Sequence, residues 1–137
     1  MSYYISSEIR SAVWSRAKGC CEYCLIYEED SYYLHEIDHI LPKKHGGQTE
    51  LDNLALSCFF CNRYKGTDIG SMDQITGKFI LFFNPRNHIW DDHFRLEGNR
   101  IIPLTPFGRV TSLILKFNHP QRRIEREFLI KLGCYPP

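Results

Sequence analysis

Residues 35–66 bring together side chains that suit metal-assisted cleavage of a phosphodiester bond. Such cleavage needs a base that takes a proton from water and a cation that neutralises charge on the phosphoryl and leaving oxygens. A histidine ionises near neutral pH, which makes His39 the candidate base. Hard divalent cations prefer carboxylate and amide oxygens, and Asp38 and Asn62 supply them. We therefore predict a catalytic site built from these three residues.

The spacing of these residues predicts the direction in which each one points. Neighbouring residues of a strand face opposite sides, so Asp38 can face a cation while His39 faces the attacking water. Asn62 directly follows Cys61 and lies about 100° further around a helix. Cys61 and Asn62 can therefore each contribute to a different metal site.

Two Cys-x-x-Cys pairs predict a structural zinc site. The sequence contains no signal segment and no apolar run of membrane-spanning length, so we expect the chain in the reducing cytoplasm, where paired cysteines bind metals. The 33 residues between the pairs exceed the gap of a zinc ribbon and contain the Asp38-His39 segment, which the zinc would close at its base. The alternative is a set of buried free cysteines, and Cys20 and Cys134 are expected to take no part. The predicted ligands are Cys21, Cys24, Cys58 and Cys61.

Local clusters of basic residues must attract a nucleic acid, because the net charge is only +1. Lys43 and Lys44 lie in one predicted loop, and Arg63 and Lys65 follow Cys61. These four residues are the predicted nucleic-acid contacts. A second basic stretch near the carboxyl end is equally consistent with an ordinary solvated surface, and it contains Arg122, Arg123, Arg126 and Lys131.

Short elements are expected to position the site. A serine cap and a glycine stop predict a packing helix between Ser6 and Gly19. We expect the remaining elements of this region to be a strand at 32–37 that delivers Asp38 and His39, a loop at 41–50, a return strand at 51–57 and a helix at 59–65 that ends at Gly66.

The second half of the chain predicts a small extension. Its near-continuous apolar run fits a buried strand, a Glu-Gly-Asn turn fits a hairpin, and two proline starts fit helices. These elements are expected at 78–83, 94–102, 105–117 and 120–132. The expected organisation is a packing helix in 1–19, a metal-binding core in 20–70 and an extension packed on that core in 71–137.

The ordered set of motifs in residues 21–66 resembles the HNH endonuclease family, whose fold is called ββα-metal. The matching pieces are Cys-x-x-Cys, Glu-x-Asp-His-x-x-Pro from Glu36, Gly46-Gly47, Asn53-Leu54 and Cys-x-x-Cys-Asn-x-x-Lys-Gly from Cys58. A weaker similarity to an extension found in some bacterial HNH proteins covers residues 84–109. The resemblance implies an α+β fold with a small ββα-metal unit and a four-cysteine zinc site.

The resemblance also implies a role for each site residue. His39 would be the general base, Asp38 and Asn62 would hold one catalytic ion, and Asn53 would brace the loop that carries His39. Some relatives have a histidine in the place of Asn62. An amide oxygen suits Mg²⁺ or Mn²⁺ better than transition metals, so we predict that one of these two ions is the catalytic cofactor. The products would carry 5′-phosphate and 3′-hydroxyl ends.

The sequence therefore predicts a metal-dependent endonuclease that acts on nucleic acid, with DNA as the favoured substrate and no membrane partner. Contacts mainly to phosphates would give low sequence specificity. One alternative is a zinc-stabilised nucleic-acid-binding module without catalysis, although such a module has no need of Asp38, His39 and Asn62 together. The other is a nuclease subunit that a protein partner activates, and a homodimer also remains open.

Overall fold

The first helix of the fold, α1 (Ser7–Ala17), begins where the sequence predicts, and the computed structural model describes residues 4–137. The Ser6 hydroxyl accepts a hydrogen bond from the amide of Ile9, which satisfies a backbone donor at the start of the helix. The helix ends at Lys18 and Gly19, which both adopt left-handed backbone angles. Val13 packs on Leu54 and Leu56, so this helix covers one side of the strand pair that follows. The predicted packing helix is thus present, although residues 1–3 of its range lie outside the described chain.

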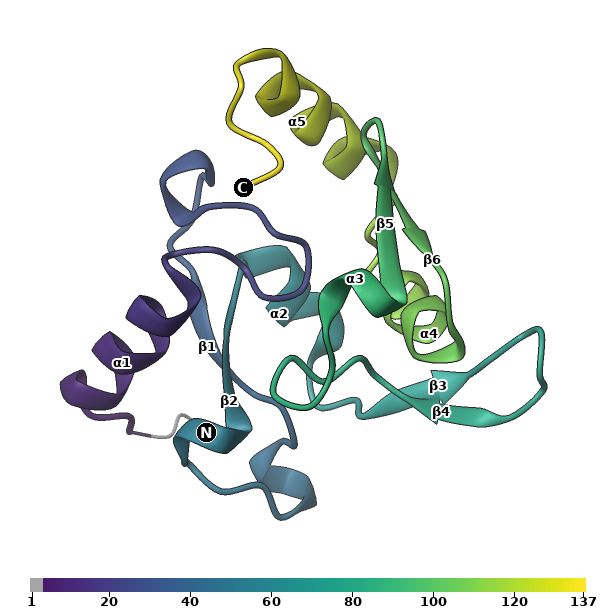
Figure 1. Cartoon of the computed structure of the whole chain (residues 1–137). Coiled ribbons are helices and arrows are strands. Elements are labelled where there is room, and N and C mark those ends of the chain that lie inside the picture. Colours follow the sequence, from purple (N-terminus) through teal and green to yellow (C-terminus); the bar gives the residue numbers. More distant parts are fainter. Residues whose placement is uncertain (1–3) are drawn as a thin grey trace.

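A pair of short antiparallel strands and one helix form the centre of the molecule (Figure 1). Strand β1 (Glu36–His39) pairs with β2 (Leu54–Ser57), with Asp38 opposite Ala55. Helix α2 (Phe59–Lys65) follows at once and has the bounds predicted from the sequence. Both strands are shorter than predicted, and Asp38 and His39 lie within β1 instead of after it. The reason is that the pairing is confined to four residues on each side, with the 3₁₀ turn η3 (Leu51–Asn53) before β2.

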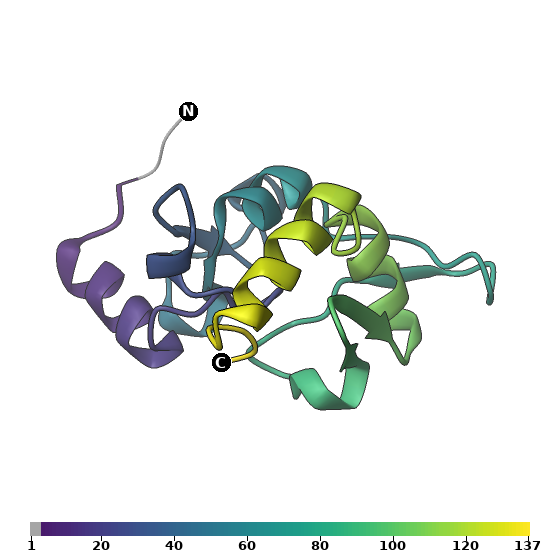
Figure 2. The same cartoon turned by 90° about the horizontal axis from the view of Figure 1, so that it is seen from above.

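The apolar run at 78–83 does not form a buried strand, so this prediction is wrong. Strand β4 (Phe79–Leu81) pairs only with β3 (Gly70–Met72), and this two-stranded ribbon extends away from the rest of the molecule in both views (Figures 1 and 2). Burial alternates along β4: Phe79 and Leu81 are each 53% exposed, whereas Ile80 between them packs against the main core cluster. Only the residues that follow the strand, Phe82 and Phe83, are buried.

The remainder of the extension consists of a hairpin and helices. Strands β5 (Phe94–Glu97) and β6 (Arg100–Pro103) form the predicted hairpin around Gly98. The Thr105 side chain accepts a hydrogen bond from the amide of Gly108 at the start of the next helix. That helix ends at Ile114, three residues earlier than predicted, and Lys116 shortly after it has a positive φ. The helices of this part are α3 (Trp90–His93), α4 (Pro106–Ile114) and α5 (Pro120–Lys131).

The largest cluster of buried residues joins the metal-binding region to the extension. It includes the four predicted zinc ligands together with residues from β5, β6, α4, α5 and the carboxyl-terminal tail. Tyr135, in that tail, donates a hydrogen bond of 2.8 Å to the carbonyl oxygen of Cys24. The mixture of helices with separate antiparallel strand pairs confirms the predicted α+β class. No helix within residues 4–137 has the length and apolar character needed to cross a membrane.

Candidate nuclease site and metal centre

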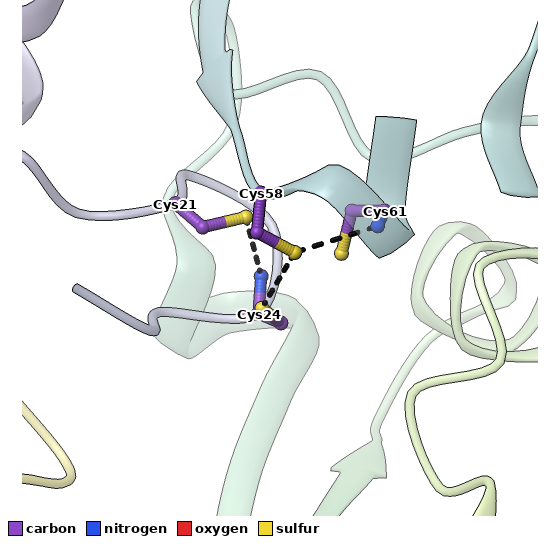
Figure 3. A group of neighbouring side chains, drawn as sticks. All are labelled: Cys21, Cys24, Cys58 and Cys61. Carbon is purple, nitrogen blue, oxygen red and sulfur yellow. Dashed lines mark hydrogen bonds between the residues drawn. The ribbon is translucent and has the colours of Figure 1, made fainter. Parts of the chain in front are cut away.

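The four predicted zinc ligands come together in one buried cluster (Figure 3). Cys21 and Cys24 lie in the turn that follows α1, Cys58 caps the start of α2, and Cys61 lies in its first turn. Their sulfur atoms all lie within 4.8 Å of one another, and the sulfurs of Cys24 and Cys58 are 3.6 Å apart. Four sulfurs around a tetrahedral zinc at about 2.3 Å are separated by about 3.8 Å. The cluster is therefore positioned to bind a metal ion and is compatible with zinc.

Hydrogen-bond donors surround these sulfurs and favour their thiolate form. The amide of Cys24 points to the sulfur of Cys21, and the amide of Cys61 points to that of Cys58, both at 3.4 Å. The guanidinium of Arg122, on α5, lies 3.1 Å from the Cys61 sulfur and 3.6 Å from the Cys58 sulfur. A tetrathiolate zinc centre carries excess negative charge, and a buried arginine offsets part of it. Both interpretations of Arg122, as a nucleic-acid contact and as a solvated surface residue, are therefore wrong, because it is only 8% exposed and supports the cluster.

The three predicted catalytic residues line a single hollow of about 350 Å³. Asp38 and His39 reach it from β1, and Asn62 reaches it from α2. Lys43 and Lys44, in the 3₁₀ turn η2 (Lys43–His45), form part of its rim. The arrangement places a carboxylate, an imidazole and an amide together beside positive charge, which suits a phosphate group and a divalent cation.

Asp38 is buried, and its two carboxylate oxygens are held in fixed positions. The hydroxyl of Tyr23 donates a hydrogen bond of 2.6 Å to Oδ2, and the Lys65 ammonium lies 3.1 Å from Oδ1. Burial raises the pKa of this carboxyl, while Lys65 and Tyr23 oppose that rise. A carboxylate has about four lone-pair sites, so two sites remain beyond these two contacts. Tyr23 lies between Cys21 and Cys24, which links the orientation of Asp38 to the metal cluster.

Lys65 does not contact nucleic acid in the predicted way, because its side chain is buried inside the core unit. Its ammonium group bonds to Asp38 and to the carbonyl oxygens of His39 and Ile40, and the residue is 1% exposed. An ammonium has three donors, and these contacts use them all. The prediction failed because a lysine is exposed by default, whereas its burial here depends on a charge partner on β1.

The His39 ring is oriented by a residue that the sequence did not single out. Its Nε2 atom lies 2.9 Å from the hydroxyl oxygen of Thr49, in the loop between the strands. Burial lowers the pKa of the imidazole from its ordinary value of 6.5. The nearby ammonium groups of Lys43 and Lys65 also lower it, and Asp38 acts in the opposite direction. The imidazole is therefore neutral, and able to accept a proton, over most of the physiological pH range.

Asn53 closes the loop that connects β1 to β2. Its amide oxygen accepts a hydrogen bond of 2.8 Å from the amide of Leu41, and its Nδ2 donates to the carbonyl oxygens of Leu41 and Gln48. Gly47 passes so close to this bridge that a Cβ atom there would lie 1.6 Å from the Leu41 carbonyl oxygen. These contacts hold the loop in the way that the sequence predicts for Asn53. The importance of Asn53 for catalysis stays a prediction.

The Asn62 amide group is held on the opposite wall of the site by Glu36, to whose carboxylate its Nδ2 donates a hydrogen bond. Glu36 and Asp38 are two residues apart on β1, so they share one side of the strand. Nothing in the residue pattern pointed to Tyr23 or Thr49. Arg63, the remaining predicted contact, is exposed and lies over the ring of Phe59 at 4.5 Å.

An antiparallel strand pair followed by a helix, with Asp38 and His39 on the first strand and Asn62 on the helix, defines a ββα-metal unit. Residues 21–68 of the chain match the family model of HNH endonucleases, which confirms the resemblance predicted from the sequence. The match covers the four cysteines as well as Asp38, His39 and Asn62. No curated protein matches the chain.

Proposed function

We propose that this protein is a metal-dependent endonuclease that hydrolyses phosphodiester bonds in nucleic acid, with DNA as the favoured substrate. The observation that carries the proposal is that Asp38, His39 and Asn62 line the same hollow. The match of residues 21–68 to the family model of HNH endonucleases supports the proposal. A module that only bound nucleic acid would not require a buried carboxylate held by two partners next to a histidine.

In the proposed reaction, His39 takes a proton from the water that attacks phosphorus. Thr49 fixes the imidazole ring, and burial keeps it neutral before the reaction. The rim residues Lys43 and Lys44 attract the phosphate backbone through charge, which positions the substrate without reading its sequence. The bond to the 3′ oxygen breaks, so the products carry 5′-phosphate and 3′-hydroxyl ends.

Oxygen atoms of Asp38 and Asn62 are the donors that would hold a catalytic Mg²⁺ or Mn²⁺. An ion bound there would neutralise charge on the phosphoryl group and stabilise the leaving oxygen. The donor set is made of oxygens and includes no thiolate or imidazole, which favours a hard cation. Lys65 and Tyr23 hold the Asp38 carboxylate in a fixed orientation, which prepares it as a ligand. We further propose zinc as the ion of the four-cysteine cluster.

Cleavage of supercoiled plasmid tests the proposal. We expect nicked or linear product with Mg²⁺, none after a brief EDTA treatment, and recovery when Mg²⁺ alone is added back. Zinc content must be measured in parallel, because EDTA can also remove the thiolate-bound ion. The variant His39→Ala should lose about 10²-fold in rate, because it lacks the base. Intact plasmid in every sample, together with a measurable gel shift, would instead support a binding module.

The pH dependence of cleavage provides a second prediction. A base accepts a proton only when it is neutral, so the rate rises through the pKa of His39 and then levels off. Because burial holds this pKa below 6.5, the plateau is expected to begin below about pH 7.5. Single-turnover rates at saturating Mg²⁺ between pH 5 and 9 would show this. A rate that continues to increase tenfold per pH unit above 7.5 would show that another group takes the proton.

A further inference from the structure

Five aromatic side chains from α2 and from the segment before β1 form a continuous surface, and we call this surface the aromatic face. Tyr33 stacks on Phe59 with ring centroids 4.2 Å apart, and Phe60 lies nearly parallel to Tyr64 at 6.4 Å. Tyr32 contacts Tyr33 edge-on and is 93% exposed. Phe60 is 37% exposed. The rings therefore pack on one another while their outer members remain open to solvent.

Two cations flank the aromatic face. The guanidinium of Arg63 lies 4.5 Å from the ring centre of Phe59, and the ammonium of Lys116 lies 4.8 Å from that of Tyr64. Both cations belong to exposed residues. Such contacts hold positive charge next to ring surfaces, where it can meet the phosphates of a strand whose bases lie on the rings. The combination of apolar rings with positive charge differs from an apolar protein-binding patch.

The aromatic face is continuous with the candidate nuclease site. Phe59, Phe60, Arg63 and Tyr64 all lie on α2, and Asn62 is on the same helix. Cys61 and Lys65 occupy the buried side of this helix, and Phe59 and Arg63 lie about 60–100° around it from Asn62, so they are the members of the face next to the hollow. Tyr32 and Tyr33 precede β1, the strand that carries Asp38 and His39. Helix α2 therefore contributes both to the hollow and to the aromatic face, and the segment before β1 supplies the other two rings.

We propose that the aromatic face binds an unpaired stretch of the nucleic-acid substrate, whose bases stack on Tyr32 and Phe60. This inference rests on the proposed nuclease function and specifies its substrate as a single strand or a duplex with an unpaired region next to the cleaved bond. The strand leaves the hollow along α2, and Arg63 and Lys116 pair with its phosphates. Glu36 on β1 is bound by Asn62, and Glu125 on α5, which lines a cavity together with Tyr32 and Phe60, is accompanied there by Arg122 and Arg126.

An unpaired strand suits this surface better than an intact duplex does. Bases in a duplex are stacked on one another, so their faces are not available to protein rings except at ends. Stacking on aromatic side chains is tolerant of sequence, because every base has a π-face. The low sequence specificity expected from phosphate contacts at the hollow agrees with this mode of recognition.

Fluorescence of 2-aminopurine placed in an oligonucleotide tests the proposal, because stacking on a ring quenches it. The experiment uses the His39→Ala chain with Mg²⁺, so that binding is measured without cleavage. We expect strong quenching, and about tenfold tighter binding of a single-stranded oligonucleotide than of the blunt duplex of the same sequence. The variants Tyr32→Leu and Phe60→Leu should each weaken single-strand binding about tenfold, because they keep an apolar side chain but remove the ring.

Matched controls lie on the β3–β4 ribbon. Phe79→Leu, at an exposed ring remote from α2, should leave single-strand binding unchanged. Arg63→Gln should reduce the salt dependence of binding by about one counterion, whereas Lys78→Gln should not. Equal affinity for single strand and duplex, with no effect of the leucine variants, would overturn the proposal even if plasmid is cleaved. Loss of self-association in those variants with unchanged nucleic-acid binding would also overturn it, by assigning the face to a second copy of the chain.

Discussion

Removal of the ion from the four-cysteine cluster is expected to unfold the core unit. The cluster joins the turn after α1 to the start of α2, and the two strands of this unit pair over only four residues each. Structural zinc in small domains contributes about 10–16 kcal/mol of apparent binding free energy at neutral pH. Without the ion, no bonds would hold the four sulfurs together, and Arg122 would be buried without the negative charge that it offsets. We therefore expect a strong zinc chelator to abolish the folded state, not merely to weaken it.

The fluorescence of Trp90, in a Trp14→Phe background, and the zinc content of the protein would together measure this effect. Trp90 donates a hydrogen bond of 2.8 Å to the carbonyl oxygen of Tyr23, between the first two cysteines, so its signal reports on the cluster. Cys58→Ser should lower the zinc content and reproduce the effect of the chelator. Cys134→Ser is the matched control, because Cys134 lies outside the cluster. A stable, cooperatively folded chain without bound metal would contradict the prediction.

The variant Lys65→Met is expected to lose about 3–5 kcal/mol of stability, because it leaves the Asp38 carboxylate buried without its charge partner. It also removes the hydrogen bonds to the carbonyl oxygens of His39 and Ile40. Unfolding in urea at pH 7, in the presence of zinc, measures the change. The expected loss is large because both partners of the ion pair are almost completely removed from water.

Two further variants separate the lost charge pair from other effects of the substitution. Adding Asp38→Asn to Lys65→Met removes the unpaired charge and should recover about 1–3 kcal/mol. Lys44→Met changes an exposed lysine in the turn η2 and should alter stability by less than about 0.5 kcal/mol. A Lys65→Met protein as stable as the Lys44→Met protein would show that the ammonium of Lys65 is solvated and not paired with Asp38.

Features that depend on local signals were predicted well from the sequence. Helix α2 has the predicted bounds because Cys58 caps it and Gly66 ends it, and both residues are visible in the chain. The β5–β6 hairpin follows from its Glu-Gly-Asn turn for the same reason. The spacing of the four cysteines predicted their cluster, because each pair forms one tight turn. The hollow beside Asp38, His39 and Asn62 follows from the strand–loop–helix order.

Features that depend on contacts distant in the sequence were missed. Asp38 is held by Tyr23, which precedes it in the sequence, and by Lys65, which follows it. Neither residue type by itself predicts burial next to a carboxylate. Arg122 reaches the cysteines from α5, 61 residues beyond Cys61. The run at 78–83 was misassigned because apolar composition alone does not say whether another layer covers a strand. In each case the deciding partner lies on a different element.

The loop closed by Asn53 has a consequence for redesigning this protein. A single amide fastens both ends of the segment from Leu41 to Gln48, so the residues between those ends do not have to maintain the spacing of β1 and β2. Lys44 and His45 are exposed there, whereas Gly47 is sterically fixed. Positions 44 and 45 can therefore be varied without changing the rest of the fold. Libraries that randomise these two positions while retaining Gly47 and Asn53 would alter substrate preference.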